Sequence, residues 1–153
     1  MSLLFFLIIT VGGGLLLGFL TRPGEWYANL AKPSFTPPNG VFGPIWTLLY
    51  IMIAIAGWRI FAHEPLGPAM MAWTIALALN FCWSPIFFGL NQPAAAFCVI
   101  VTLLAMIITF ILLAWRQDTV SALLFVPYGA WTFFAALLNA AICHLNNPKC
   151  EVR

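Results

Sequence analysis

The chain has 153 residues, of which 63% are hydrophobic and 7% are charged, and its mean hydropathy is +1.01. Soluble domains carry roughly 25% charged residues, so this composition excludes a water-soluble globular domain. The formal net charge of +2 comes without a basic patch, and we therefore expect no nucleic-acid partner. The lipid bilayer must be the solvent of most of this chain.

Five continuous apolar runs, each about 20 residues long, predict five membrane-spanning helices, because backbone polar groups must be satisfied locally in lipid. They cover about residues 3–20, 42–62, 69–90, 93–115 and 120–144. The first run lacks a basic start and a cleavage site, so we interpret it as a retained helix. Short connections after it make successive helices antiparallel neighbours. The predicted fold is therefore all-α, a single integral membrane domain over residues 1–153 built as a five-helix bundle.

The connection between the first two spans, from Arg22 to Trp46, is long and stiff. It contains five of the chain's 11 prolines, two tryptophans and a tyrosine. A mere connector could be short and polar, so we expect this segment to be a structured loop that folds over the bundle.

Basic residues outside the spans suggest an orientation. Four lie on the side of the long loop and the C-terminus, and two on the other side: Arg22, Lys32, Lys149 and Arg153 against Arg59 and Arg116. Because basic residues are enriched in cytoplasmic segments, we expect a cytoplasmic loop and C-terminal tail.

Two asparagines lie within the spans, Asn80 and Asn139, and a polar side chain in lipid costs free energy unless it has a partner or a function. Neither is ionisable, and no span holds an Asp, Glu, Lys or Arg near its centre, which argues against an ion pump or a proton-coupled carrier. Hydrogen bonding between helices and a polar position in a ligand pocket both remain open for them.

Aromatic residues recur at helical spacing on three spans, and residues three or four positions apart share one helix face. The stripes are Phe42, Trp46 and Tyr50 on the second span, Asn80, Trp83 and Phe87 on the third, and Trp131, Ala135 and Asn139 on the fifth. Such faces serve either core packing or a pocket for a flat ligand. Pro85 and Pro127 tend to kink the third and fifth spans, which can leave a cavity.

The first span carries Gly14 and Gly18 at a spacing that permits close helix approach, either within the molecule or in a dimer. The cysteines show no zinc spacing, and the pair Cys143-His144 near His63 is more typical of a membrane edge than of haem or metal ligation. We expect no metal site and no obligatory cofactor. No acid–base pair or nucleophile supports ordinary catalysis.

Three segments together resemble the TspO/translocator-protein family, also called the peripheral-type benzodiazepine receptor or tryptophan-rich sensory protein family. They are EWYANLAKPSFTPPNGVFGPIWTLLY, ALNFCWSPIFFGLNQ and LLFVPYGAWTFFAALLN, in order along essentially the whole chain. The lack of an N-terminal targeting segment and the short tail are similar to a bacterial member. The resemblance thus implies a bacterial cell membrane, inner or outer.

The resemblance implies a protein that is often a homodimer and binds porphyrins such as protoporphyrin IX or haem-type tetrapyrroles. In relatives, cholesterol and synthetic isoquinoline or benzodiazepine drugs also bind. The family pocket lies within the bundle, under the first loop. The ligand-binding residues carried over are Trp26, Tyr27 and Pro37 in the loop, Phe42, Trp46 and Tyr50 on the second helix, Asn80 and Trp83 on the third, and Trp131 and Ala135 on the fifth.

Three roles are compatible with this resemblance. The first is a translocator or receptor-like protein that acts in tetrapyrrole regulation, transport or stress sensing, and it is the one we expect. The second is light- and oxygen-dependent degradation of protoporphyrin IX, with porphyrin as substrate and Trp46 and Trp131 steering radicals. The third is a scaffold whose pocket is incidental.

Two further points concern ligand chemistry. The stretch LLNAAICHLNNPK lacks the tyrosine of the cholesterol motif of animal members, so sterol binding by that route is not expected. Arg22 or Lys32 could meet the propionates of a porphyrin, although solvation alone would also explain both charges.

Overall fold

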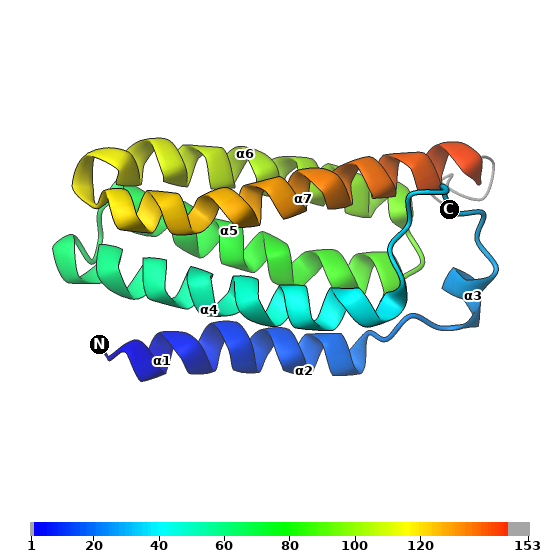
Figure 1. The fold of residues 1–153 in the computed structure, drawn as a ribbon, viewed down its shortest axis with the longest axis horizontal. Coiled ribbons are helices and arrows are strands. Elements are labelled where there is room, and N and C mark those ends of the chain that lie inside the picture. Colours follow the sequence, from blue (N-terminus) through cyan, green and yellow to red (C-terminus); the bar gives the residue numbers. More distant parts are fainter. Residues whose placement is uncertain (1, 147–153) are drawn as a thin grey trace.

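The computed structural model describes residues 2–146 and shows an all-helical bundle, which confirms the predicted fold class (Figure 1). Its elements in chain order are α1 (Leu3–Leu7), η1 (Ile8–Gly12), α2 (Gly13–Leu20), α3 (Glu25–Ala28), α4 (Asn39–His63), α5 (Pro68–Ser84), η2 (Pro85–Gly89), α6 (Pro93–Gln117) and α7 (Thr119–Leu145), where η denotes a π-helical turn.

Five helical segments of the described chain are long and apolar enough to cross a membrane, as predicted. They run over Leu3–Leu20, Asn39–His63, Pro68–Gly89, Pro93–Gln117 and Thr119–Leu145. The largest difference from the expected bounds is at α4, which begins at Asn39 rather than Phe42. Pro38 precedes it as the N-cap residue, with φ −57° and ψ 141°, the extended backbone that is usual directly before a helix.

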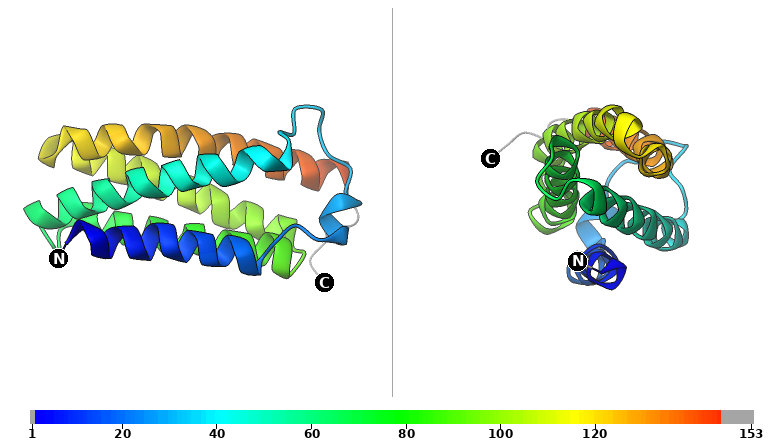
Figure 2. Two further views of the ribbon diagram at one scale, coloured as in Figure 1. Left: turned by 60° about the horizontal axis from the view of Figure 1, so that its bottom comes forward. Right: turned by 90° about the vertical axis from the view of Figure 1, so that its left-hand side faces the viewer.

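The helices run side by side, and α4, α5, α6 and α7 surround the interior when the bundle is viewed from one end (Figure 2). Sequential antiparallel packing joins α5 to α6 and α6 to α7, and α7 also packs on α4. The first span, made of α1, η1 and α2, lies outside this group against α4, and α2 also touches α5. The first span is therefore the most peripheral part of the bundle.

The half of the bundle away from the loop is closely packed. Its core includes small residues that bring helices together, such as Ala54, Ala56 and Ala76, all almost completely buried. A Cβ on Gly57 would lie 2.4 Å from the Trp73 ring, so glycine is required at this contact. These contacts hold α4 and α5 close together in this half of the molecule.

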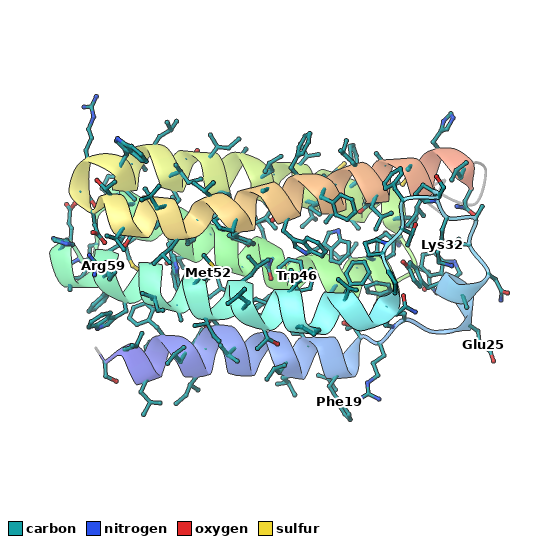
Figure 3. All side chains as sticks on the ribbon, viewed as in Figure 1. Phe19, Glu25, Lys32, Trp46, Met52 and Arg59 are labelled. Atoms are coloured by element: carbon teal, nitrogen blue, oxygen red, sulfur yellow. The ribbon has the colours of Figure 1, made fainter. Side chains whose placement is uncertain are left out.

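An ion pair closes the same end of the bundle. The Arg59 guanidinium donates two hydrogen bonds to the Asp118 carboxylate, at 2.7 and 2.8 Å, and the Ser121 hydroxyl donates to the same carboxylate. The Arg59 hydrogen bonds hold the pKa of the Asp118 carboxyl well below its usual range. Because Asp118 directly precedes α7, the pair joins the end of α4 to the start of α7. Arg59 is labelled at this end in Figure 3.

The long loop folds over the opposite end of the bundle, as predicted. Tyr27 and Leu30 are buried in a cluster with Phe87 of η2 and with residues of α6 and α7. The side chain of Asn146 pairs with the backbone of Ala31, accepting from its N–H at 2.9 Å and donating to its carbonyl at 2.8 Å. The loop is therefore held to the end of α7.

The two prolines expected to kink helices differ in their effect. Pro127 lies inside α7, which continues through it without interruption. Pro85 instead begins the π-turn η2, in which the Leu90 N–H donates to the Pro85 carbonyl five residues earlier, at 2.9 Å. Because proline lacks an N–H, it breaks the regular α-helical ladder at this point.

Candidate functional site

A cavity of about 700 Å³ lies in the half of the bundle next to the loop. Side chains from α2, α3, α4, α5, η2, α6 and α7 line it, so every membrane-spanning segment contributes. Its size falls within the range of roughly 300–1,000 Å³ that is typical of small-molecule sites. The cavity is the candidate functional site.

The α4 face of the cavity is aromatic. Phe42, Trp46 and Tyr50 all line it, each one helical turn from the next. Trp46 lies with its ring centroid 5.6 Å from that of Tyr50 and 6.4 Å from that of Tyr128 on α7. Figure 3 shows Trp46 on the half of α4 nearer the loop, with Met52 and Arg59 labelled farther from the loop. The predicted stripe on the second span therefore forms one wall.

Asn80 from α5 lines the cavity and also joins three helices. Its Oδ1 accepts from the Tyr50 hydroxyl at 2.8 Å, and its Nδ2 donates to the Tyr128 hydroxyl at 3.0 Å. Asn80 is 5% exposed, so these bonds satisfy a buried amide. Asn80 therefore joins helices by hydrogen bonds and also borders the cavity, whereas contact with a ligand stays a prediction.

Asn139 from α7 also makes hydrogen bonds to other helices, nearer the loop. It accepts from Trp83 Nε1 at 3.2 Å and donates to the Pro93 carbonyl at 2.8 Å. The Trp83 ring stacks on Phe87, with centroids 5.1 Å apart and planes at 26°. Trp83, Phe87 and Asn139 all line the cavity, and the π-turn η2 brings the adjacent Phe88 to it as well.

The structure brings together most, but not all, of the residues predicted to bind a ligand. Seven of the ten line the cavity: Tyr27, Phe42, Trp46, Tyr50, Asn80, Trp83 and Ala135. Trp26, Pro37 and Trp131 do not belong to the lining, and Trp26 packs instead on Phe87 at 5.9 Å between ring centroids. Ligand binding by any of the ten stays a prediction.

Trp131 lies behind the cavity wall. Its ring contacts Phe42, which lines the cavity, at 5.8 Å, and Phe134, which does not, at 5.4 Å. Its Nε1 is buried and has no hydrogen-bond partner among the described residues. Of the three residues in the predicted α7 stripe, only Ala135 and Asn139 reach the cavity.

Sequence reasoning did not anticipate the contribution of the first span. Gly14 and Gly18 of α2 both line the cavity, but they serve different purposes. A Cβ on Gly14 would lie 2.1 Å from the Tyr50 ring, whereas a Cβ on Gly18 would meet nothing within 4 Å. Gly14 therefore permits close packing within the molecule. The four-residue glycine spacing was the signal that α2 approaches another element.

The two basic residues near the loop differ in their position relative to the cavity. Arg22 lines the cavity, and its guanidinium lies over the Phe19 ring at 4.4 Å. Lys32 does not line the cavity; its ammonium donates to the Ala28 and Leu30 carbonyls at 3.2 and 3.3 Å and lies over the Tyr27 ring at 4.6 Å. Only Arg22 is therefore placed to meet a ligand.

The chemistry of the cavity favours binding over acid–base catalysis. Within residues 2–146, Arg22 is the one charged side chain in the lining, and no carboxylate, histidine or cysteine belongs to it. The described part of the chain also contains no group of histidine, cysteine and acidic residues that could hold a metal ion. A large apolar surface with a few polar groups is typical of a small-molecule site.

Comparison with known proteins finds one family. The model of the TspO/MBR family matches residues 5–145. The chain is 41% identical over 124 residues to the tryptophan-rich protein TspO of Archaeoglobus fulgidus, covering 79% of this chain and 80% of that protein. It is 36% identical over 136 residues to the tryptophan-rich sensory protein of Cereibacter sphaeroides (89% and 86%), and 36% identical over 143 residues to the translocator protein of Ovis aries (88% and 83%).

Proposed function

This chain belongs to the TspO/MBR family of membrane proteins, and on that basis we propose that its cavity binds protoporphyrin IX or a related flat tetrapyrrole. Family membership and the five membrane-spanning helices make it an integral membrane protein of receptor or sensory type. Porphyrin binding is the specific activity proposed for this site. Binding is the step that a sensor and a translocator would share.

The observation that carries this proposal is the aromatic lining of the cavity. Trp46 and Tyr50 on one wall and Trp83 and Phe87 on another line a space of about 700 Å³. A porphyrin is a broad π-surface, and offset contacts between aromatic rings contribute about 0.5–1.5 kcal/mol each. The amides of Asn80 and Asn139 add the few polar groups that orient a ligand.

The direct test is a titration of the purified protein in detergent with protoporphyrin IX, measured by quenching of intrinsic tryptophan fluorescence. Saturable quenching is expected. Trp46→Phe should weaken the affinity about two- to tenfold, because it shrinks a ring that lines the cavity. Trp131→Phe should have a smaller effect, because Trp131 contacts Phe42 rather than the cavity. Quenching that rises linearly without saturation would contradict the proposal.

A second function is favoured by the oxidisable side chains at the cavity. Trp46 and Tyr50 line it in contact with each other, so a radical formed next to the ligand would have these two rings as oxidisable neighbours; Tyr128 packs on Trp46 behind the lining. In this alternative the bound porphyrin is a substrate that light and oxygen degrade. Aerobic illumination of the complex should then yield a new coloured product that requires Trp46. Bleaching equal to that without protein would leave binding as the function.

A further inference from the structure

We propose that Arg22 makes the cavity selective for flat ligands that carry a carboxylate, by pairing its guanidinium with that group at the rim of the cavity. This inference rests on the proposed function, because it requires a flat ligand in the aromatic part of the cavity. It adds the chemical group by which the site would distinguish an acidic ligand from a neutral one of the same shape.

Arg22 has its hydrogen-bonding capacity unused. Within residues 2–146 it makes no hydrogen bond and no ion pair, and its guanidinium only rests on the Phe19 ring. The side chain is exposed although the residue lines the cavity, which places it at the rim rather than in the interior. A guanidinium presents five donors in a planar fork that matches a carboxylate.

The backbone next to Arg22 is anchored. The Thr21 hydroxyl lies 2.6 Å from the Ser84 hydroxyl, which ties the end of α2 to α5, and it also donates to the Leu17 carbonyl at 2.7 Å. These bonds fix the position of the residue that immediately precedes Arg22. The arginine is therefore presented from a defined point, and only its side chain must move to reach a ligand.

The polar groups of the cavity would give a ligand one orientation. Thr21, Arg22 and Ser84 lie where α2 and α5 end beneath the loop, whereas the ring surfaces of Trp46 and Tyr50 lie deeper along α4. A flat ligand with a carboxylate on one edge would bury its rings among the aromatic residues and leave its charge at the rim. Leaving the charge at the rim avoids the cost of burying an unpaired carboxylate.

Lys32 supplies a matched comparison in the same loop. It carries the same charge, but its ammonium is already bound to two backbone carbonyls, and it does not line the cavity. A general attraction of acidic ligands to a positive surface would depend on both residues. Direct pairing at the cavity would depend on Arg22 alone.

The test compares protoporphyrin IX with its dimethyl ester, which keeps the ring but has no charge, by fluorescence quenching in an uncharged detergent. Arg22→Gln should weaken binding of the diacid about five- to tenfold and change binding of the ester less than twofold. Lys32→Gln should change neither, and Arg22→Lys should retain part of the preference for the diacid. Unfolding temperature, measured for each variant, shows that the fold is kept.

Three results would overturn the inference while leaving the proposed function intact. The first is an equal loss of affinity for diacid and ester in Arg22→Gln, and the second is no loss for either. The third concerns the phosphate of an anionic lipid, which a guanidinium can also pair with. If Arg22→Gln reduces retention of phosphatidylglycerol but not the preference for the diacid, the arginine serves the lipid and the inference is wrong. Failure of both porphyrins to bind the unaltered protein would overturn the proposed function itself.

Discussion

Some positions around the cavity tolerate no larger side chain. Gly14 is one of them, because its Cα faces the Tyr50 ring and leaves no space for a Cβ. The contact also helps to hold Tyr50 in the position from which its hydroxyl donates to Asn80. A glycine on the most peripheral helix thus supports a hydrogen bond near the centre of the bundle.

Ala135 is the small residue whose size should matter most for binding. It is 8% exposed on α7 and lines the cavity. Ala135→Leu should lower the affinity for protoporphyrin IX about tenfold or more, because three added carbons would occupy ring space. Ala105→Leu, at an exposed position on α6, provides the matched control and should leave the affinity unchanged. Equal affinities for the two variants in the fluorescence titration would show that the ligand binds elsewhere.

The elements show how the loop is kept over the cavity. Asn146 directly follows α7, and its amide pairs with both backbone groups of Ala31 and also donates to the Ile142 carbonyl at 2.8 Å. The side-chain amide thus satisfies both the N–H and the carbonyl of Ala31, as a neighbouring β-strand would. The position of the loop therefore depends on α7, about 115 residues away along the chain.

Asn146→Ala should loosen this loop without unfolding the bundle. Two backbone groups of Ala31 would lose their partners, and each lost hydrogen bond to a part-buried group costs about 0.5–1.5 kcal/mol. Hydrogen exchange should show faster exchange over residues 25–36, with exchange in α4 to α7 unchanged. His144→Ala, at an exposed position in the last turn of α7, should not accelerate loop exchange. Unaltered loop protection in Asn146→Ala would mean that the buried aromatic cluster alone holds the loop.

At the scale of the whole molecule, the two ends of the bundle differ in packing. The end at which α4 finishes and α7 begins is packed with small residues and closed by the ion pair of Arg59 and Asp118. The end under the loop holds the cavity and the aromatic side chains that line it. Substitutions at the ion pair are therefore expected to leave the residues that line the cavity in place.

The ion pair makes a prediction for the pH dependence of unfolding. The pKa of the Asp118 carboxyl is lowered in the folded protein, so its stabilisation is present above the ordinary carboxyl pKa of about 4 and is lost as pH falls below it. Asp118→Asn should cost about 1–3 kcal/mol at pH 7, because it leaves the guanidinium without its charged partner. Thermal unfolding in detergent should show this difference shrinking between pH 5 and pH 3.

Two controls accompany that measurement. Glu64→Gln changes an exposed carboxylate at the same end of the bundle and should have little effect on the unfolding temperature. Porphyrin affinity at pH 7 should be the same in Asp118→Asn as in the unaltered protein, because the pair lies at the far end from the cavity. A difference in unfolding temperature that persists unchanged at pH 3 would contradict the assigned role of the carboxylate.

Residue spacing predicted much of the candidate site. The steps of four from Phe42 to Tyr50 placed three rings on one face of α4, and all three line the cavity. The same reasoning included Trp131 with Ala135, but Phe42 stands against the Trp131 ring. Helical spacing tells which residues share a face, whereas the packing of α4 against α7 decides which part of that face is covered.

Hydropathy by itself determined the class of this protein, because a chain in lipid must satisfy its backbone hydrogen bonds within each segment, and helices do so locally. Only the tertiary structure decided three features: that Arg22 rather than Lys32 lines the cavity, that Gly14 approaches Tyr50, and that Asn146 pairs with Ala31. Each feature depends on residues that are far apart in the sequence, and their separation shows no helical period. Such contacts depend on how the helices pack around one another, which local patterns do not encode.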